Sequence, residues 1–422
     1  MNNKKSLKFF IDCTLLVIST FTYLLLVCPL LSIYRFFFLG KDKLKKTSTK
    51  QIVYFSSVQW FDVWQRPQHC VSGLSKNFQV FYISPLPFHH IFSDIKGWLK
   101  KRIFEYNKEL IIYSPILFSG ENKSHFVRLL NRMLTVGYMT ELFVKYKISN
   151  PVIWMNNPFH AYIIEKFSYK FVVYDIMDEY IKFSIAPRDV QKLEDLILKK
   201  SKVVFTGTNA LFKEKKRYHS NISFVPCGVD FEMFNSADKI SRSDLPENIS
   251  KINHPIIGYI GGLNERIDTE LIEYIAEKKE NWNIILVGPV QRSFNIRKKH
   301  DNILFTGLKP YKELPKYISK FDVAILPYKI SDATYFINPV KLLEYMAAGK
   351  PVVSVPIPDI IEFYSDKIEL AEDYESFAEK IEKLLSFPDK KKIRDGIELA
   401  KTKTWESMVN DMLNKIEKLI SL

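Results

Sequence analysis

One stretch decides the fold of the second half of the chain, namely Asn338-Pro339-Val340-Lys341-Leu342-Leu343-Glu344-Tyr345-Met346-Ala347-Ala348-Gly349-Lys350-Pro351-Val352-Val353. Asn338 is a typical helix N-cap, Pro339 suits the first helical position, and Gly349 ends the helix just before a β-branched run. The sequence therefore predicts one helix followed directly by a buried strand, which is typical of a parallel α/β sheet.

The start of this predicted helix suits a phosphate group. Its N–H groups and dipole attract anions, and Lys341 adds a full positive charge in the first turn. Glu344 lies on the same face, where its carboxylate would accept hydrogen bonds from ribose hydroxyls. We therefore predict that Asn338, Pro339, Val340, Lys341 and Glu344 bind a phosphorylated ligand. The alternative is that Lys341 and Glu344 form an ordinary exposed i,i+3 ion pair.

A second phosphate-binding element is predicted upstream. Residues 256–260 form a strand that runs into Gly261 and Gly262, and a helix follows Arg266. Glycines at a strand end let backbone amides approach a diphosphate, and Arg266 would bind it through two nitrogen atoms. A tight turn between strand and helix, however, needs glycine even where no ligand binds.

Outward from these two elements, short β-rich runs alternate with helical stretches along most of the chain, which predicts parallel sheets with crossover helices. A polar stretch at 230–254 without a strand signal divides the pattern, so we predict two doubly wound, Rossmann-like domains that face a cleft, at 51–229 and 255–400, with 230–254 as the interdomain linker. The predicted strands are 52–57, 80–84, 110–114, 152–155, 171–176, 203–206, 222–226, 256–261, 282–287, 303–306, 323–327 and 352–355.

Composition narrows the class of protein. The chain has 422 residues and a formal net charge of +14, which suits nucleic acid, an anionic membrane surface or acidic small molecules. The basic residues are spread out and no nucleic-acid-binding module is recognisable, so we predict no nucleic-acid partner. The four cysteines are scattered, which argues against a disulfide framework and against a paired-cysteine metal site.

An almost unbroken apolar run from Phe9 to Leu39 is long enough to span a bilayer. We predict a membrane anchor at 1–40 and a basic linker at 41–50, with the body of the protein on the cytoplasmic face because the heavier basic cluster follows the run. Pro29 leaves a re-entrant helix open as the alternative to a single span. The basic residues on the two sides are Lys4, Lys5 and Lys8, then Arg35, Lys41, Lys43, Lys45, Lys46 and Lys50.

These features resemble the group 1 (family 4) glycosyltransferases of the GT-B fold. The end of that family's donor motif resembles the run Gly349-Lys350-Pro351-Val352-Val353. Its interdomain signature resembles Val225-Pro226-Cys227-Gly228-Val229-Asp230, with Cys227 where Asn is usual. Phe305-Thr306-Gly307 resembles its base-binding element, and Trp405 resembles the position where the last helix, 401–422, crosses back to the first domain. Trp64-Gln65-Arg66-Pro67-Gln68-His69 resembles a motif of the teichuronic-acid and surface-polysaccharide transferases.

The resemblance implies transfer of a sugar from a nucleotide-sugar donor, with retention of configuration, without a metal and without a cofactor. Gly261, Gly262, Arg266 and the residues of the helix start would then hold the donor, and Arg266 and Lys341 would stabilise the leaving diphosphate. One departure stands out. The family's first glutamate would fall at Phe336, so we expect backbone amides near Asn338 to hold the sugar instead.

Acceptor-side and further catalytic residues are predicted at the ends of strands in the first domain. The resemblance assigns Trp64, Arg66 and His69 to the acceptor side, and Glu179 joins them because it follows a predicted strand. His160 and Asp178 are the candidates for direct catalytic roles by the same argument, although a single histidine after a strand is more often a loop or core residue.

The leading interpretation is a hexosyltransferase that acts on a glycan or lipid-linked acceptor in cell-surface polysaccharide biosynthesis, at the inner face of a bacterial inner membrane. Two alternatives stay open at this point. One is a nucleotide-sugar epimerase of the same fold, which would have little use for an anchor. The other is a membrane-tethered glycan-assembly scaffold without turnover, which the missing glutamate and Cys227 would suit.

Overall fold

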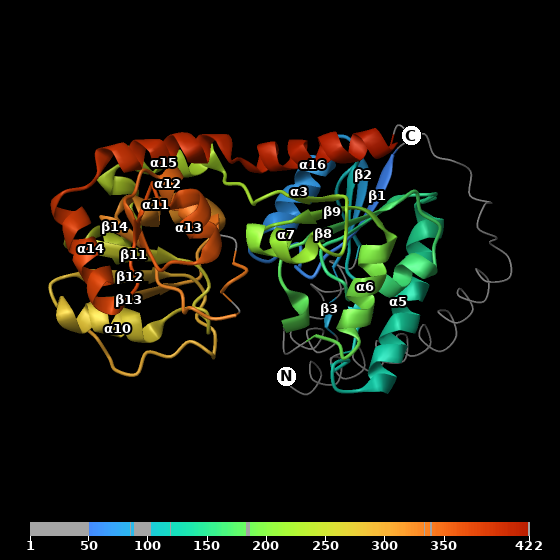
Figure 1. The fold of residues 1–422 in the computed structure, drawn as a ribbon, viewed down its shortest axis with the longest axis horizontal. Helices are drawn as coiled ribbons and strands as arrows, with labels where there is room; N and C mark the ends of the chain where they lie inside the picture. Colours follow the sequence, from blue (N-terminus) through green and yellow to red (C-terminus); the bar gives the residue numbers. More distant parts are fainter. Residues whose placement is uncertain are drawn as a thin grey trace, which may run out of the picture. The chain divides into compact units, whose positions relative to one another are not determined.

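A computed structural model describes residues 50–84, 86–87, 103–118, 120–182, 186–332, 334–337 and 340–420. These residues divide into two compact units, the first formed by the described parts of 50–62, 74–175 and 180–204 and the second by those of 63–73, 176–179 and 205–420 (Figure 1). The predicted anchor at 1–40 lies outside the described residues, as does the linker except for Lys50. Among the helices that the structure describes, none has the length and apolar content needed to cross a membrane.

The first sheet has eight strands in the order β10-β9-β8-β7-β1-β2-β5-β4. Strand β1 pairs in parallel with β2 and with β7, whereas the edge strand β4 runs antiparallel to β5. The bounds are β1 Gln51–Phe55, β2 Gln79–Ile83, β4 Ile103–Asn107, β5 Leu110–Tyr113, β7 Val152–Met155, β8 Val172–Ile176, β9 Ser201–Thr206 and β10 Ile222–Phe224, and a separate pair is formed by β3 Leu86–Pro87 and β6 Ile116–Leu117.

Successive side chains along these strands point to opposite faces of the first sheet and so contact different neighbours. Tyr54 stacks on Tyr82 and on Trp154 of the neighbouring strands, at ring distances of 5.7 and 5.9 Å. On the opposite face Tyr113 contacts Tyr138 of α5, and the Tyr174 hydroxyl donates to Glu194 of α6 at 3.1 Å. Helices α5 (His125–Lys145) and α6 (Val190–Lys200) therefore cover the same face of the sheet.

The second sheet is wholly parallel, with the order β13-β12-β11-β14-β15-β16. In chain order this is 3-2-1-4-5-6, the arrangement of dinucleotide-binding sheets, whose ligands bind where the winding reverses between the first and fourth strands. Here that point lies between β11 and β14. The bounds are β11 Ile256–Ile260, β12 Asn283–Val287, β13 Ile303–Gly307, β14 Val323–Leu326, β15 Val352–Ser354 and β16 Glu369–Leu370.

The remaining helices belong to the second unit, apart from two 3₁₀ turns of the first unit, η3 Ala161–Glu165 and η4 Tyr180–Lys182. They are α3 Arg66–Leu74, α7 Asn209–Lys215, α8 Phe231–Asn235, α9 Glu247–Ser250, α10 Thr269–Lys278, α11 Leu314–Ser319, α12 Val340–Ala347, α13 Pro358–Tyr364, α14 Tyr374–Ser386, α15 Lys390–Thr402 and α16 Trp405–Ile420, with the 3₁₀ turns η5 Ser236–Lys239, η6 Arg242–Asp244 and η7 Tyr311–Glu313.

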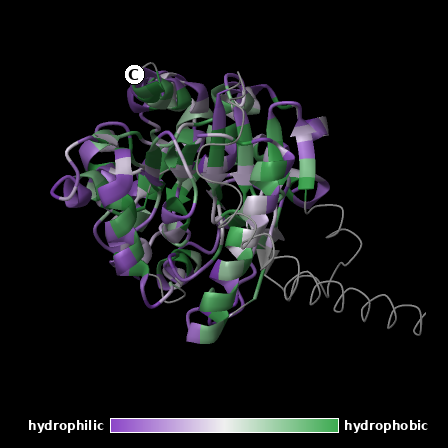
Figure 2. Cartoon of the chain, turned by 90° about the vertical axis from the view of Figure 1, so that its right-hand side faces the viewer, coloured by the Kyte–Doolittle hydropathy of each residue, from purple (hydrophilic) through white to green (hydrophobic). Residues whose placement is uncertain are grey.

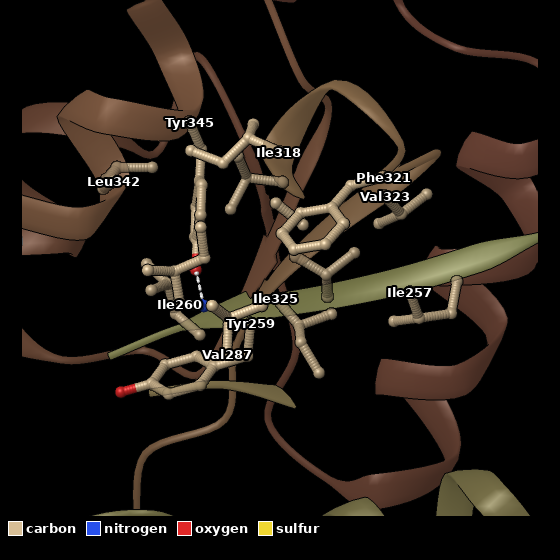
Figure 3. Packing of buried hydrophobic residues seen from close by; sticks show 14 of the residues in the cluster. Ile257, Tyr259, Ile260, Val287, Ile318, Phe321, Val323, Ile325, Leu342 and Tyr345 are labelled. Carbon is tan, nitrogen blue, oxygen red and sulfur yellow. Dashed lines mark hydrogen bonds between the residues drawn. The ribbon is translucent and has the colours of Figure 1, made fainter. Parts of the chain in front are cut away.

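The core of the second unit forms around β11 (Figure 3). Ile257 and Ile260 pack with Val323 and Ile325 of the neighbouring strand β14 and with residues of the covering helices. Gly258 is required in the middle of β11 because a Cβ atom there would collide with the ring of Phe321. Close packing of strand against helix therefore explains this glycine without any ligand.

The stretch predicted as the interdomain linker, 230–254, forms the short helices α8, η5, η6 and α9 and no strand. It is nevertheless part of a hydrophobic core, because Phe231, Phe234 and Ile249 are buried in the same cluster as β11. Polar composition concealed this role, since only a few apolar residues at separate positions carry the burial.

Each predicted strand is present within two residues of its expected bounds. The structure adds β3, β4, β6 and β16, which the sequence pattern did not predict. The α/β fold with two parallel-sheet domains is thus confirmed.

Candidate functional site

The carboxyl edge of the second sheet is a row of glycine turns. Gly261 follows β11 and its N–H donates to the Val287 carbonyl at 2.9 Å, while the N–H of Gly288 donates to the carbonyl of Gly307 at 3.1 Å. A Cβ atom on Gly288 would collide with the Gly261 carbonyl oxygen, and one on Gly261 would collide with the Tyr259 hydroxyl. Neighbouring turns therefore pack backbone against backbone.

Gly262 differs from these glycines. A Cβ atom there would meet only the Asn264 side chain, at 3.6 Å, and the residue is half-buried. The alternative that the double glycine serves only a tight turn thus explains Gly261, but packing does not explain Gly262. Its backbone is open to an approaching group, as a diphosphate would require.

Arg266 is held in position by the loops on both sides of it. The N–H of Arg266 donates to the side chain of Asn264 at 3.0 Å, and the carbonyl of Arg266 accepts from the N–H of Lys329 at 2.8 Å. The guanidinium is about one-third exposed and lies 3.7 Å from the Asp178 carboxylate. The structure therefore brings two of the predicted catalytic residues together.

This contact affects the protonation of Asp178. Desolvation raises the pKa of the Asp178 carboxyl, and the charge of Arg266 opposes that rise. Because the pair is partly exposed, the attraction is screened and modest. An anionic ligand at Arg266 would compete with Asp178 for the guanidinium.

The helix that follows Arg266, α10, has its own N-terminal cap. The Asp268 side chain accepts from the N–H of Leu271 at 3.1 Å and from the hydroxyl of Tyr374 at 3.0 Å. A carboxylate therefore already lies at this helix start, which makes the start of α10 unsuitable for a phosphate. The predicted contribution of the start of α12 stays a prediction, because Asn338 and Pro339 lie outside the described residues.

On α12 the Lys341 ammonium donates to both carboxylate oxygens of Glu344, at 3.0 and 3.1 Å. The Glu344 side chain is only 2% exposed, whereas that of Lys341 is 26% exposed. The alternative of an ordinary exposed ion pair is therefore wrong for Glu344. Burial raises the pKa of Glu344, and the charge of Lys341 opposes the rise. Asn338 and Pro339 lie outside the described residues, and α12 is described from the half-buried Val340 onward.

Three buried tyrosines that sequence reasoning missed, Tyr259, Tyr328 and Tyr345, lie close enough to Glu344 for its charge to act on their hydroxyls. The Tyr345 hydroxyl accepts from the N–H of Ile260 at 2.7 Å, and the hydroxyls of Tyr259 and Tyr328 hydrogen-bond to each other. Burial raises the pKa of Tyr328 to about 12, and the charges of Arg266 and Glu344 both act on this hydroxyl. Tyr328 therefore lies within electrostatic range of both Arg266 and Glu344. The only sequence signal was its place directly after a predicted strand.

Phe336, at the position where the resembling family has its first glutamate, is 7% exposed. Its ring meets that of Tyr335 edge to face at 5.0 Å. A buried phenyl group cannot accept a hydrogen bond from a sugar hydroxyl, so this departure from the family pattern is real in structure as well as in sequence.

The motif at 64–69 is integrated into the second unit. Arg66, at the start of α3, is buried, and its guanidinium donates to the Val225 carbonyl at 2.8 Å and contacts the Met408 sulfur at 3.4 Å. The ring of His69 stacks on Trp405 with centroids 4.1 Å apart and meets Trp64 edge-on. Burial lowers the pKa of His69 to about 4, which keeps it neutral at physiological pH. Three segments that carried the resemblance are thus in mutual contact.

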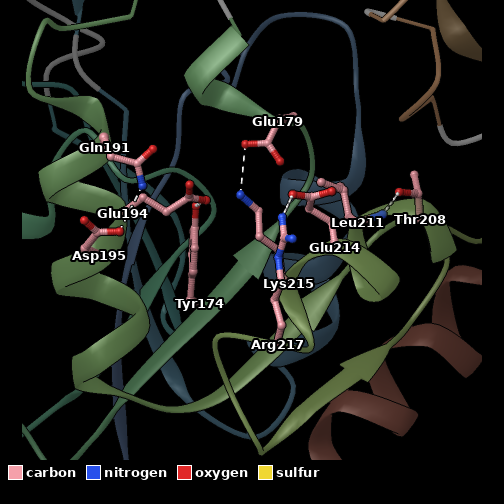
Figure 4. Close-up of polar contacts among 10 residues, drawn as sticks. All are labelled: Tyr174, Glu179, Gln191, Glu194, Asp195, Thr208, Leu211, Glu214, Lys215 and Arg217. Carbon is pink, nitrogen blue, oxygen red and sulfur yellow. Dashed lines mark hydrogen bonds and ion pairs between the residues drawn. The ribbon is translucent and has the colours of Figure 1, made fainter.

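Glu179 is committed to a buried ion pair, since the Lys215 ammonium donates to it at 2.9 Å and both side chains are less than 10% exposed (Figure 4). It was predicted to lie on the acceptor side. An acceptor hydroxyl would have to displace Lys215 from a desolvated contact, which is costly.

His160 belongs to the first unit and is 8% exposed. Its ring stacks on Phe55 at 5.6 Å, and within the described part of the chain its Nδ1 atom has no hydrogen-bond partner. Burial, with a smaller effect from Arg132, lowers its pKa to about 4. His160 is therefore neutral, and its Nδ1 atom is buried.

A cavity of about 690 Å³ lies at the amino edge of the second sheet, where β11, β14 and β15 begin. None of the predicted site residues lines it. Polar groups that line it already have partners: His254 contacts Asp322 at 2.6 Å, and Lys350 donates to the carbonyl of Ser319 at 2.8 Å. Within the described ranges, no group of three or more histidine, cysteine, aspartate or glutamate residues has the arrangement of a metal site.

Comparison with known proteins matches residues 254–386 to the family described as "Glycosyl transferases group 1". The chain is also 26% identical over 258 residues to TuaH of Bacillus subtilis (strain 168), whose name assigns it to teichuronic acid biosynthesis as a glycosyltransferase. That alignment covers 54% of this chain and 64% of the relative, so the chain matches less than two thirds of the relative's length. The predicted resemblance is confirmed by both matches.

Solved structures share the fold. The sucrose-phosphate synthase of Thermosynechococcus elongatus aligns with a TM-score of 0.67 at 15% identity, over 88% of this chain and 99% of its own. Anabaena Alr3699/HepE, solved in complex with UDP and glucose, aligns with a TM-score of 0.59 at 14% identity, over 89% of this chain and 100% of its own. At these identities the likeness shows a GT-B-type fold and nothing further.

Proposed function

We propose that this protein is a glycosyltransferase that moves a sugar from a nucleotide-sugar donor to a glycan acceptor in surface-polysaccharide biosynthesis. The match of residues 254–386 to group 1 glycosyl transferases and the similarity to TuaH support the reaction class. Because HepE was solved in complex with UDP, a uridine nucleotide is the first donor to test.

The observation that carries this proposal is the carboxyl edge of the second sheet. An open glycine turn at Gly262, a partly exposed Arg266 and the ammonium of Lys341 belong to loops and a helix that follow β11 and β14, where the winding of the sheet reverses. Backbone amides and two cations suit a diphosphate, and Glu344 beside Lys341 suits a ribose. This edge of the sheet is where such folds bind nucleotides.

The chemistry then depends on charge. Breaking a bond between a sugar and a diphosphate develops negative charge on the leaving oxygen, and preorganised cations lower the barrier by stabilising that charge. In the proposal Arg266 leaves Asp178 and Lys341 leaves Glu344 to contact the diphosphate. Retention of configuration and independence of a metal ion are part of the same proposal, as is a neutral His160 that accepts a hydrogen bond near the acceptor.

The acceptor in this proposal is lipid-linked and lies at a membrane. The apolar run from Phe9 to Leu39 and the basic residues after it support an anchor at 1–40, which would keep the protein on the inner face of a bacterial membrane. An anchor of this kind raises the encounter rate with an acceptor that diffuses in two dimensions.

Thermal unfolding of the full chain in detergent tests the donor site. A nucleotide at about 100 times its Kd stabilises by about 2.7 kcal/mol, so a panel of nucleoside diphosphates and nucleotide sugars should yield a clear rise in Tm with one base. Arg266→Ala and Lys341→Ala should abolish that rise. Matched controls are Arg297→Ala and Lys367→Ala, whose side chains make other ion pairs.

A rise in Tm that survives both substitutions would place the nucleotide elsewhere. Absence of any rise would favour the second candidate function, a scaffold without turnover, for which the buried Phe336 is the specific observation. Release of free sugar or transfer to an added acceptor by the purified full chain would reject that candidate.

A further inference from the structure

The connection between α14 and α15 presents a phenyl ring to solvent. Phe387, the residue directly after α14, is 79% exposed. Figure 2 shows hydrophobic colour mainly on the strands and hydrophilic colour along the outer loops and helix turns, so an exposed phenylalanine departs from the general distribution. A single exposed apolar side chain is common at a protein surface. Phe387 is unusual because of what lies beside it.

Phe387 is at the rim of the cavity of about 690 Å³ that lies at the amino edge of the second sheet. Ser386 and Pro388, its two neighbours in the chain, both line this cavity, whereas Phe387 does not. Its ring therefore projects into solvent directly beside the cavity. We call Phe387 and the residues that line the cavity the 387 face.

The walls of the cavity suit an apolar occupant. The polar groups of the lining are already engaged, as in the contacts of Asp322 with His254 and of Lys350 with Ser319. A charged small molecule would have to break these contacts, whereas an aromatic side chain needs only apolar surface. That surface is supplied by Pro255, Trp282, Phe321, Pro351, Leu384 and Leu385.

The ring of Phe387 is carried on a short, ordered connection. The N–H of Phe387 donates to the Lys383 carbonyl at 2.7 Å at the end of α14. Pro388 has a fixed φ angle, and the Asp389 side chain caps the start of α15. The connection therefore loses little conformational freedom when the ring is bound, which favours association through it.

The charges of the 387 face permit contact with a second copy of the chain. The chain has a net charge of +14, so two copies repel each other over most of their surface. At the cavity, however, Asp322 and Glu382 lie together with Lys350, and Lys279 and Lys320 contact groups of the same lining. A face that meets its own copy needs both signs of charge, and this face has both.

The adjacency of ring and cavity determines which partner fits. A two-fold axis places a face against a copy of itself, so the ring of each chain meets the cavity of the other. Because Phe387 lies between two residues of the cavity wall, such a contact closes with two chains. A ring far from its cavity would instead produce an open series of copies.

We propose that the protein forms a two-fold symmetric homodimer in which Phe387 of each copy occupies the cavity of the other. The inference is independent of the proposed function. The amino edge of the second sheet is the edge opposite Gly262 and Arg266, so the carboxyl edge stays open to a ligand in both copies.

Sedimentation equilibrium of the full chain in density-matched detergent measures this association. We expect a dimer at micromolar concentration. Phe387→Asp should raise the dimer dissociation constant about thirtyfold or more, because it places a charge at the centre of the contact. The matched control is Ile330→Asp, at a 67% exposed residue that follows the carboxyl end of β14, and it should leave the dissociation constant unchanged.

A mixing experiment tests the reciprocal arrangement. Leu385→Lys alters the cavity wall and keeps the ring, whereas Phe387→Asp alters the ring and keeps the cavity. Each variant alone should be a monomer with the wild-type Tm. An equal mixture should form a dimer, because one intact ring meets one intact cavity and the introduced aspartate and lysine have opposite charges.

The proposal is overturned by a wild-type monomer, by an unchanged dissociation constant in Phe387→Asp, or by a mixture of the two variants that stays monomeric. Photo-cross-linking identifies the occupant of the cavity directly. Benzoylphenylalanine at position 387 should react with the segment of Trp282 or Leu385 in an isotope-labelled second copy. Reaction within a single chain only would also overturn the dimer, because another segment of the same chain would then be the partner of this face.

Discussion

Replacement of Lys341 by methionine should destabilise the second unit, because it leaves Glu344 buried without its cation. Removal of one partner of a buried pair costs about 3–5 kcal/mol, and the 26% exposure of Lys341 reduces this to about 2–3 kcal/mol through screening. For a unit of this size the expected fall in Tm is about 4–12 °C. Thermal unfolding of the full chain, followed by circular dichroism, measures it.

The same variant should also change how the stability of the protein depends on pH. Burial raises the pKa of Glu344, and in Lys341→Met the charge that opposes the rise is gone. A carboxyl whose folded pKa is raised binds more protons in the folded state, so stability is greatest below the unfolded pKa and falls as pH rises through the folded pKa. The deficit of the variant should therefore be small near pH 4 and grow toward pH 7.

The double variant Lys341→Met, Glu344→Gln serves as the control, because it also removes the Glu344 carboxylate, which the single variant leaves buried without a cation. We expect it to recover most of the lost Tm and to lose the added pH dependence. If Lys341→Met unfolds at the wild-type temperature at pH 7, or if the glutamine does not rescue it, the description of Glu344 as a desolvated carboxylate dependent on Lys341 is wrong.

Three other predictions follow from the contacts of the second unit. Gly288→Ala should lower the free energy of unfolding in urea by about 2–3 kcal/mol, because its Cβ atom meets the adjacent turn. Gly262→Ala should change that free energy by less than about 0.5 kcal/mol, yet weaken the nucleotide-induced rise in Tm. The reverse order of the two stabilities would contradict the packing described for the two turns. Lys215→Met should cost about 3–5 kcal/mol by stranding Glu179, and equal stability of the variant and the wild type would show that this carboxylate is not buried with its cation. The lowered pKa of His69 makes the folded state disfavour the imidazolium, so wild-type stability should fall as pH drops from 6.5 toward 4. His69→Phe should reduce that fall by about 1–2 kcal/mol. Parallel pH profiles of stability for the variant and the wild type would argue against a neutral, desolvated imidazole at this position.

The sequence predicted the strands of both sheets because buried parallel strands are continuous apolar runs between turn residues. It missed β4, whose residues from Phe104 to Asn107 are exposed, and β16, which has two residues, since neither presents an apolar run. The core role of 230–254 was missed for a related reason. Its burial depends on separate residues such as Phe234 and Ile249 in short helices.

The candidate site was predicted in part. Glycine, arginine and lysine at the ends of strands or starts of helices are visible in a sequence, and Arg266 and Lys341 are where that pattern suggests. The burial of Glu344 was not predictable, because i,i+3 spacing is the same for exposed and buried pairs. The partner of Glu179, thirty-six residues away, and the tyrosines around Glu344 depend on tertiary contacts that spacing does not encode.

The contact of the 64–69 motif with the last helix has a consequence for protein engineering. His69 stacks on Trp405, the Cβ of an added side chain at Gly73 would meet Val409, and the Cys70 thiol contacts Met412, so α3 and α16 form one interlocking surface although they are over three hundred residues apart in sequence. Chimeras that exchange the first half of this chain for that of a relative should therefore carry the relative's last helix with it. Substitutions at positions 69 and 405 should likewise be inherited as a pair when such proteins diverge.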